Sequence, residues 1–323
     1  MRPSPFFAVV IPTFNQADFL KMALTSVLDQ TFEEFEVFVV NNESTDATLD
    51  VISDLGDSRV QVIKFQNHGV IGAARNVGIR ASTAPYVAFL DSDDSWYRNK
   101  LERVAEAFED DPEIGLVCHD QDLIWDGQAA GRTHYGPTHR FRGSTYEQVL
   151  FIGNGPSTSA TVVRREYLDQ AGCFSEKPEY IAAEDFDLWL TMAKISPFKY
   201  LPEVMGSHHF HGTNASDNID SQLSSIFNIL DKHCAELKKS SSSNPRRAIR
   251  RLYAHTYFGA GRQEHRRGRF HRTLKYYAKA LSTYPLHLKT YGGLALLLVD
   301  RVLGFTTRRR ISSVLLGPSW RRR

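Results

Sequence analysis

Three carboxylates stand within four residues, directly after an apolar run that ends in Phe89-Leu90. The cluster is Asp91-Ser92-Asp93-Asp94. This much negative charge at one place destabilises a fold unless a cation compensates it, and Mg²⁺ and Mn²⁺ prefer carboxylate oxygens. Such ions are usually held by one or two carboxylates together with the phosphates of a substrate. We therefore predict a divalent metal bridged to a diphosphate. The structural alternative is an N-cap cluster for the helix that follows.

Other patterns narrow the chemistry. The run His208-His209-Phe210-His211 contains zinc-ligand types, but no paired cysteine and no H-E-x-x-H motif accompanies it. The sequence also lacks G-x-G-x-x-G after a strand, G-x-x-x-x-G-K-[ST] and G-x-S-x-G. Dinucleotide oxidoreductases, P-loop ATPases and α/β-hydrolases are therefore disfavoured. The three cysteines are widely spaced, so they predict neither a disulfide framework nor a zinc site.

The elements that must position these residues begin with alternating strands and helices. Short β-branched and aromatic runs predict strands at Phe6–Ile11, Glu36–Val40, Val60–Phe65 and Tyr86–Leu90. Segments with helical period separate them, which is typical of βαβ units and a largely parallel sheet. Right-handed crossovers place the carboxyl ends of such strands at one edge, where α/β sheets bind ligands.

The next hundred residues complete this domain. We predict a helix around Leu101–Phe108, a strand at Ile114–Cys118 and a strand at Ala160–Val163. A helix at Asp185–Ile195 closes the domain, with Trp189 on its buried face. Residues 126–143 show no period and are rich in Gly, His, Arg and Thr, so they predict a loop over the site.

Several sequence blocks occur together in a recognisable order. They are Val9–Asn15, Gln30-Thr31-Phe32, Ser44-Thr45-Asp46, Ala74–Gly78, Asp91–Asp94, Cys173-Phe174, Glu184–Trp189 and His211–Asn214. In this order they resemble the blocks of family 2 inverting glycosyltransferases, and the resemblance covers residues 6 to about 217. It implies an α/β fold, a Rossmann-like type A glycosyltransferase sheet with flanking helices, and a nucleotide-diphospho-sugar donor.

The resemblance assigns a set of residues to the nucleotide-sugar pocket: Pro12, Thr13, Asn15, Asn41, Asn42, Arg75, Asp91, Ser92 and Asp93. It puts Asp91 near the donor ribose and Asp93 on the metal, with His211 near the metal or the diphosphate. Arg75 would approach the base or the diphosphate. The alternatives are a surface charge for Arg75 and a surface histidine for His211. For the residues after the first strand, the alternative is ordinary turn chemistry.

The chain departs from the family pattern after the second strand. Most relatives resemble Val-Asp-Asp there, whereas this sequence has Val40-Asn41-Asn42. An Asn carbonyl still accepts a hydrogen bond from uracil N3–H, but it is neutral and its amide also donates. A UDP- or dTDP-sugar is the predicted donor, and guanine stays open.

The pair Glu184-Asp185 occupies the position of the general base in the resemblance. An inverting displacement needs a carboxylate to take the proton of the acceptor hydroxyl, which contributes about 10²–10⁴-fold. We choose Asp185, with Glu184 as second candidate. The alternative is that both acids only favour the start of a helix.

Charge divides the chain. Lys and Arg number 39 against 37 acids, a net charge of +2, but residues 238–323 hold 21 Lys and Arg and only two acids. We therefore predict a catalytic domain of residues 1–237. A basic helical region, residues 238–323, follows a Ser-rich linker at Lys238–Pro245, with helical segments at Tyr253–Gly261 and Phe270–Tyr284.

The basic region suggests a partner. No recognised nucleic-acid module accompanies its charge, so we favour an anionic membrane surface over nucleic acid. Leu294–Val299 with Val302, Leu303 and Phe305 would lie in the interface. Packing of this region on the acidic domain is the third alternative.

The sequence lacks a stretch long enough to span a membrane, and its apolar N-terminal stretch is too short for a signal peptide. We expect a cytoplasmic protein, peripheral on the inner face of the cell membrane. The predicted function is a metal-dependent inverting glycosyltransferase using Mn²⁺ or Mg²⁺, with a glycan or lipid-linked acceptor in cell-envelope polysaccharide synthesis. The alternative is a noncatalytic scaffold that binds nucleotide sugars or polyanions.

Overall fold

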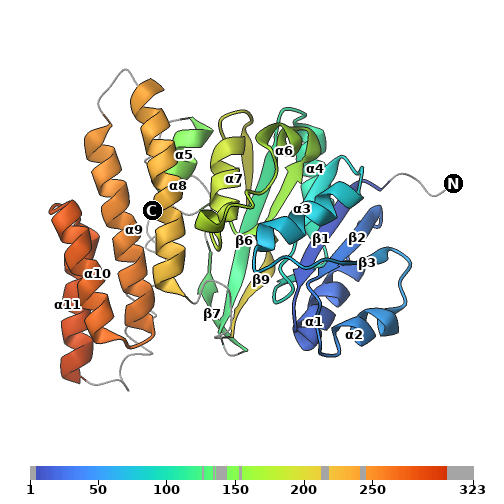
Figure 1. Ribbon diagram of the computed structural model, residues 1–323, viewed down its shortest axis with the longest axis horizontal. Helices are drawn as coiled ribbons and strands as arrows, with labels where there is room; N and C mark the ends of the chain where they lie inside the picture. Colours follow the sequence, from blue (N-terminus) through green and yellow to red (C-terminus); the bar gives the residue numbers. More distant parts are fainter. Residues whose placement is uncertain are drawn as a thin grey trace. The chain divides into compact units, whose positions relative to one another are not determined.

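The computed structural model describes residues 5–125, 127–133, 135, 144–152, 155–211, 218–240 and 245–303 (Figure 1). The strands are β1 (Phe7–Thr13), β2 (Phe35–Asn41), β3 (Val60–Lys64), β4 (Tyr86–Phe89), β5 (Ser95–Trp96), β6 (Leu116–Trp125), β7 (Gln128–Arg132), β8 (Thr161–Arg164) and β9 (Phe198–Phe210). The helices are α1 (Ala17–Leu28), α2 (Thr48–Leu55), α3 (Ile71–Ala81), α4 (Lys100–Asp110), α5 (Thr145–Ile152), α6 (Arg165–Ala171), α7 (Glu184–Met192), α8 (Ile219–Ser240), α9 (Arg246–Arg266), α10 (Phe270–Thr283) and α11 (Leu288–Leu303). Two 3₁₀ turns cover Thr158–Ala160 and Pro178–Tyr180.

The chain forms two compact units. The first comprises Met1–Val149 and Asn154–Asn214, and the second comprises Leu150–Gly153 and Ala215–Arg323. The division therefore falls before α8, whereas the sequence analysis places it after residue 237. Lys238–Ser240, the start of the predicted linker, forms the last turn of α8. Residues 241–244 lie outside the described residues.

The first unit is built on one mixed sheet. Its strand order is β3-β2-β1-β4-β8-β6-β9-β5, with β7 paired to β6. The four strands predicted from the first ninety residues pair in parallel, as expected. From β4 onward the sheet becomes mixed, because β8 runs antiparallel to both β4 and β6. The predicted α/β class is confirmed.

Helices cover both faces of this sheet. Successive side chains of a strand point to opposite faces, so Val9 and Ile11 pack with α1 and α4 while Val10 packs with α3, α6 and α7. Every residue of β1 is buried, which explains its continuous apolar sequence. Gly78 lets α3 approach β1 closely, because a Cβ there would lie 2.5 Å from Val10 Cγ1.

The structure contains strands that the sequence analysis did not predict. The 13-residue strand β9 runs parallel to β6 and antiparallel to the short β5. β7 lies inside residues 126–143, where a loop was predicted, so that prediction is wrong for Gln128–Arg132. Residues 126, 134 and 136–143 lie outside the described part of the chain. β9 matters most for the site, because it carries the histidine run to the end of β4.

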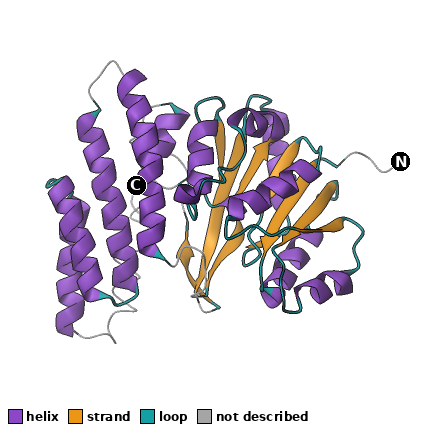
Figure 2. Ribbon diagram, viewed as in Figure 1, coloured by secondary structure: helices purple, strands orange, loops and turns teal. Residues whose placement is uncertain are grey.

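The described part of the second unit consists of helices only (Figure 2). α9 packs on α10 through Ala254, Phe258, Tyr277 and Ala280, which confirms the two predicted helical segments. α9 extends beyond its predicted bounds, from Arg246 to Arg266, whereas α10 matches its predicted segment to within one residue.

Candidate active site

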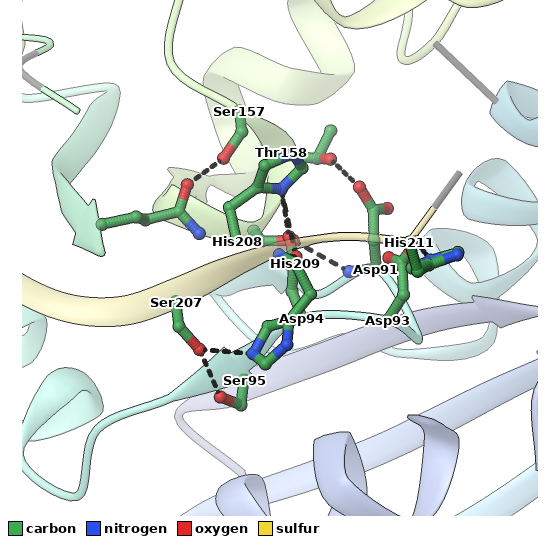
Figure 3. A network of polar contacts seen from close by, with 12 residues as sticks. Asp91, Asp93, Asp94, Ser95, Ser157, Thr158, Ser207, His208, His209 and His211 are labelled. Carbon is green, nitrogen blue, oxygen red and sulfur yellow. Dashed lines mark hydrogen bonds and ion pairs between the residues drawn. The ribbon is translucent and has the colours of Figure 1, made fainter. Parts of the chain in front are cut away.

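The predicted site residues come from the ends of neighbouring strands and from two helices. β1 and β2 end in register at Thr13 and Asn41, and Asp91 follows β4 directly after Leu90. α3 supplies Arg75 and α7 supplies Glu184. Figure 3 shows how the carboxylates after β4 meet the histidines at the end of β9.

Asp91 is held by several donors. Its carboxylate pairs with Arg75 Nη2 at 2.6 Å and accepts a hydrogen bond from Thr158 Oγ1 at 2.8 Å. Its backbone N–H donates to Ser159 Oγ at 3.0 Å. Burial alone would raise the pKa of Asp91, but Arg75 and Thr158 hold it below its usual value. Asp91 is therefore an oriented, ionised carboxylate.

Arg75 joins this carboxylate to a second one. Its Nη1 lies 2.7 Å from Glu184 Oε1, and only 5% of the Arg75 side chain is exposed. Burial would lower the pKa of Arg75, but Asp91 and Glu184 raise it. The surface-charge alternative is wrong. The guanidinium faces two acids, which favours a positioning role over direct contact with the base.

Asp185 lies beside this ion-pair network. It is half-buried, and its Oδ1 accepts the backbone N–H of Phe186 at 2.7 Å. Burial, and then the negative charge of Glu184, raises the pKa of Asp185 to about 7. Glu184 is buried and engaged with Arg75. Of the two predicted base candidates, Asp185 is therefore the less buried one, and its raised pKa suits proton transfer near neutral pH.

Asp93 faces His211. Their Oδ2 and Nε2 atoms lie 2.9 Å apart, and the His211 ring stacks on Phe19 with centroids 4.5 Å apart. Burial, and then the charges of Asp94 and Asp91, raises the pKa of Asp93 to about 6. A bound cation would relieve this repulsion. The predicted metal residues Asp93 and His211 thus come together, while Asp91 is engaged elsewhere.

Asp93 and His211 are the two side chains that would hold a divalent ion here. Among the described residues, no group of three or more His, Cys, Asp and Glu side chains is arranged to hold a metal ion. Asp93 and His211 nevertheless offer one oxygen and one nitrogen, and Mn²⁺ and Mg²⁺ commonly complete their shells with substrate phosphates and water. The residues therefore fit an ion that binds together with a diphosphate. Residues 212–217 lie outside the described part of the chain.

The third carboxylate of the cluster was not predicted as a site residue. Asp94 is fully buried; it pairs with His208 Nδ1 at 3.0 Å and accepts the backbone N–H of His209 at 3.0 Å. Burial would lower the pKa of His208, but Asp94 raises it to about 9, so the imidazole is protonated. A fully buried carboxylate requires a partner, and in the sequence the histidine run at residues 208–211 was the feature that could have indicated one.

The surface-histidine alternative for His211 is wrong, because its side chain is only 14% exposed and pairs with Asp93, and the helix-cap alternative for the acids is wrong as well. The three histidines have different partners, since His209 Nε2 bonds Ser207 Oγ at 2.9 Å, so they do not form a zinc patch. α4 starts at Lys100 without a side-chain cap, so Asp91–Asp94 is no helix cap. Trp189 lies fully in the core, as predicted, and donates to the Pro156 carbonyl.

The predicted base-reading residues lie where β1 and β2 end. Asn41 Oδ1 accepts the N–H of Ser44 at 3.1 Å, and Asn42 Oδ1 accepts the N–H of Asn67 at 2.9 Å. The Asn41 oxygen therefore takes part in a local turn, whereas the Asn42 oxygen joins two segments 25 residues apart. Each keeps a second lone pair, so the geometry permits a further acceptor role.

The first-strand residues adjoin this edge. Pro12 is buried, and the buried Thr13 Oγ1 has no hydrogen-bond partner within the described chain. Asn15 has a positive φ of 49° and its Oδ1 accepts the N–H of Thr45. Ser92 Oγ donates to Gln16 Oε1 at 2.5 Å. The Asn15 contact joins residues 30 positions apart, so ordinary turn chemistry does not account for it, and the orphaned Thr13 hydroxyl suits a ligand.

Comparison with known proteins defines the family. Residues 8–171, just over half of the chain, match the family model described as Glycosyl transferase family 2. An uncharacterized glycosyltransferase of Nostoc sp. is 34% identical over 64% of this chain and 65% of its own length. A putative teichuronic acid biosynthesis glycosyltransferase of Bacillus subtilis is 36% identical over 32% of this chain and 41% of its own length. The chain belongs to glycosyltransferase family 2.

Solved structures share the fold. The Staphylococcus aureus TarS fragment 1–349 in complex with UDP-GlcNAc has a TM-score of 0.58 at 17% identity, over 89% of this chain and 91% of that chain. A Pyrobaculum calidifontis mannosyltransferase in complex with GDP-Man and Mn²⁺ has a TM-score of 0.58 at 16% identity, over 97% and 84%. The predicted type A glycosyltransferase fold is confirmed. The chain spans 65% of the Nostoc relative and 29% of a Rickettsia bellii relative.

Proposed function

We propose that this protein is a metal-dependent inverting glycosyltransferase. It transfers a sugar from a nucleotide diphosphate donor, a UDP- or dTDP-sugar, to a glycan or lipid-linked acceptor in cell-envelope polysaccharide synthesis. The observation that carries the proposal is the ion-pair network in which Arg75 joins Asp91 to Glu184, because it sets Asp185 next to the carboxylates that follow β4.

The donor half of the site lies at the ends of β1, β2 and β4. Asp91 stays ionised beside Arg75 and can accept a hydrogen bond from a ribose hydroxyl. Thr13 Oγ1 can bond the nucleotide, since it has no partner within the described chain. Asn41 or Asn42 would then read the base. The bound UDP-GlcNAc and GDP-Man of the two structural relatives support a nucleotide-sugar donor but leave the base open.

Asp93 and His211 hold the metal in this proposal. Mn²⁺ or Mg²⁺, when bound there with the donor diphosphate, neutralises the charge that develops on the leaving group. The Mn²⁺ in the Pyrobaculum relative supports the use of a divalent ion. His208, protonated through Asp94, adds a fixed positive charge near the same carboxylates.

Asp185 completes the reaction as general base. The acceptor hydroxyl donates its proton to the Asp185 carboxylate while its oxygen attacks the anomeric carbon from the face opposite the nucleotide. The bond between the anomeric carbon and the diphosphate oxygen breaks, and the configuration inverts. Glu184, held by Arg75, keeps the start of α7 oriented for this step.

Turnover of a nucleotide-sugar panel with Mn²⁺ or Mg²⁺ tests the proposal. We expect the sugar of one donor to be transferred, or that donor to be slowly hydrolysed. Asp93→Ala should abolish this metal-dependent activity. Full metal-dependent activity in Asp93→Ala would contradict the metal assignment. Tight donor binding with no turnover on any acceptor would favour a noncatalytic nucleotide-sugar or polyanion scaffold instead.

The same proposal includes the location. None of the described helices is long and apolar enough to cross a bilayer. We propose a cytoplasmic enzyme, peripheral on the inner face of the membrane, because lipid-linked acceptors reside there and residues 238–323 are strongly basic. The teichuronic acid relative supports an acceptor of the cell envelope.

A further inference from the structure

α11 exposes an apolar face. Leu288, Tyr291, Leu298 and Val302 are 78%, 51%, 61% and 82% exposed. They recur three, seven and four residues apart, and with Ala295 between them they line one side of the helix. The opposite side packs inside the unit, where Leu296 and Leu297 are buried. The helix is thus apolar on both sides, although one side faces solvent.

The exposed face offers solvent almost no polar group. No residue on this side of the described helix, from Leu288 to Val302, is charged. The only hydroxyl on it, that of Tyr291, already donates to the Pro285 carbonyl at 3.0 Å. Monomeric proteins rarely leave a contiguous apolar patch of this kind uncovered, so the face indicates a partner.

Charge identifies the kind of partner. Residues 245–303 contain 13 Lys and Arg but only two acids, Glu264 and Asp300. Both acids are buried and engaged within the unit, Glu264 with Arg272 at 2.8 Å and Asp300 with His265 at 2.9 Å. The positive excess is therefore left for an anionic partner. A second copy carries the same excess and would be repelled.

The flanks of α11 fit a lipid surface. Lys289 and Arg301 are exposed and border the apolar face on either side, as the 100° rotation per residue requires. This is the arrangement of an interfacial helix, with apolar side chains toward the acyl region and cations at the headgroups. α11 has 16 residues, and no described helix qualifies as a span, so it would lie in the plane of the membrane.

We infer that the Leu288–Val302 face of α11 binds the surface of an anionic lipid bilayer. The inference rests on the peripheral membrane location proposed above and names the face that makes the contact; it does not depend on the transferase activity, because none of the predicted site residues lies on α11. It also corrects the segment predicted from sequence: Leu296 and Leu297 face the interior, and Leu288 and Tyr291 join the exposed face. Phe305, also predicted at the interface, lies outside the described residues.

Vesicle co-sedimentation of the full chain tests the inference. We expect binding to phosphatidylcholine vesicles that contain phosphatidylglycerol, and weak binding to phosphatidylcholine alone. The double variant Leu298→Glu and Val302→Glu should lower the partition coefficient by about tenfold or more, because two apolar contacts are lost and two anions added. Val62→Glu, at a 40% exposed position of β3, is the matched control and should bind like the wild type.

Three results would overturn the inference. The first is equal vesicle binding by wild type and double variant. The second is a wild-type dimer in sedimentation that the double variant abolishes, since a second copy would then cover the face. The third is a large loss of thermal stability in the double variant, which would show that the chain itself covers the face. Unchanged kcat on a water-soluble acceptor, together with lost vesicle binding, would support the inference separately from the proposed activity.

Discussion

The two units of this protein treat charge in opposite ways. In the first unit, the half-buried Asp91 and the buried Glu184 share one buried cation, Arg75, so the pairing fixes the geometry of a site. In the second unit, the buried Glu264 pairs with Arg272, whose side chain is 41% exposed. The first arrangement holds the charged side chains of the site in a fixed orientation. The second buries Glu264, one of its acids, against a cation that remains partly exposed to solvent.

The largest effect should follow from removal of the proposed base. Asp185→Asn keeps the shape of the side chain but cannot take a proton, so kcat should fall by about 10²–10⁴-fold. Donor affinity, measured by calorimetry, should change little. Glu166→Gln, at an exposed acid of α6, serves as the control with wild-type kcat. Wild-type turnover by Asp185→Asn would exclude this residue as the base.

The next effect concerns the buried cation. Arg75→Gln leaves Asp91 and Glu184 facing each other without a counter-charge, and breaking such a buried pair costs about 3–5 kcal/mol. Chemical denaturation should show this loss in the free energy of unfolding. Combining Arg75→Gln with Glu184→Gln should restore part of the stability, because one uncompensated acid is gone. No recovery in the double variant would show that the two residues are not coupled.

The corresponding change in the second unit should cost less. Glu264→Gln removes charged hydrogen bonds worth about 1.5–3 kcal/mol, but the 41% exposed Arg272 keeps its pair with Asp220 at 2.6 Å and is not left buried and unpaired. The same denaturation measurement compares the two variants. If Glu264→Gln lowers the free energy of unfolding as much as Arg75→Gln or more, the proposed difference between the two units is contradicted.

The smallest effect is a pH dependence. A general base must be ionised, and the pKa of Asp185 is raised to about 7. The rate should therefore rise with pH and level off above about 7; at pH 6 roughly a tenth of Asp185 is ionised, giving about tenfold lower kcat. A kcat profile between pH 5 and 8 measures the midpoint. A midpoint near 4, typical of an exposed Asp, would contradict the role of burial and of Glu184.

The local sequence pattern was sufficient to predict many strands and helices of the first unit. Continuous apolar runs predict β1, β2 and β4 because buried parallel strands need apolar side chains on both faces. β9 escaped prediction, because its sequence mixes Pro202, Gly206 and two histidines into the strand. What makes it a strand is pairing with β6 and β5, to which distant residues contribute.

The site divides in the same way. The acid clusters at Asp91–Asp94 and Glu184-Asp185 can be recognised in the sequence, because adjacent carboxylates destabilise a fold unless a cation compensates their charge. The burial of Arg75 is not visible, because it rests on partners 16 and 109 residues away. The role of Asp94 depends equally on β9 placing His208 against it.

By itself, therefore, the sequence determined the α/β class, the positions of the acidic clusters and the separation of acidic and basic halves, because these follow from residue types and short-range periodicity. The tertiary structure alone decided which acid is held and which is less buried, and which side of α11 is left exposed. Such choices depend on contacts between residues far apart in the chain, and burial by those contacts is what shifts the pKa of Asp185.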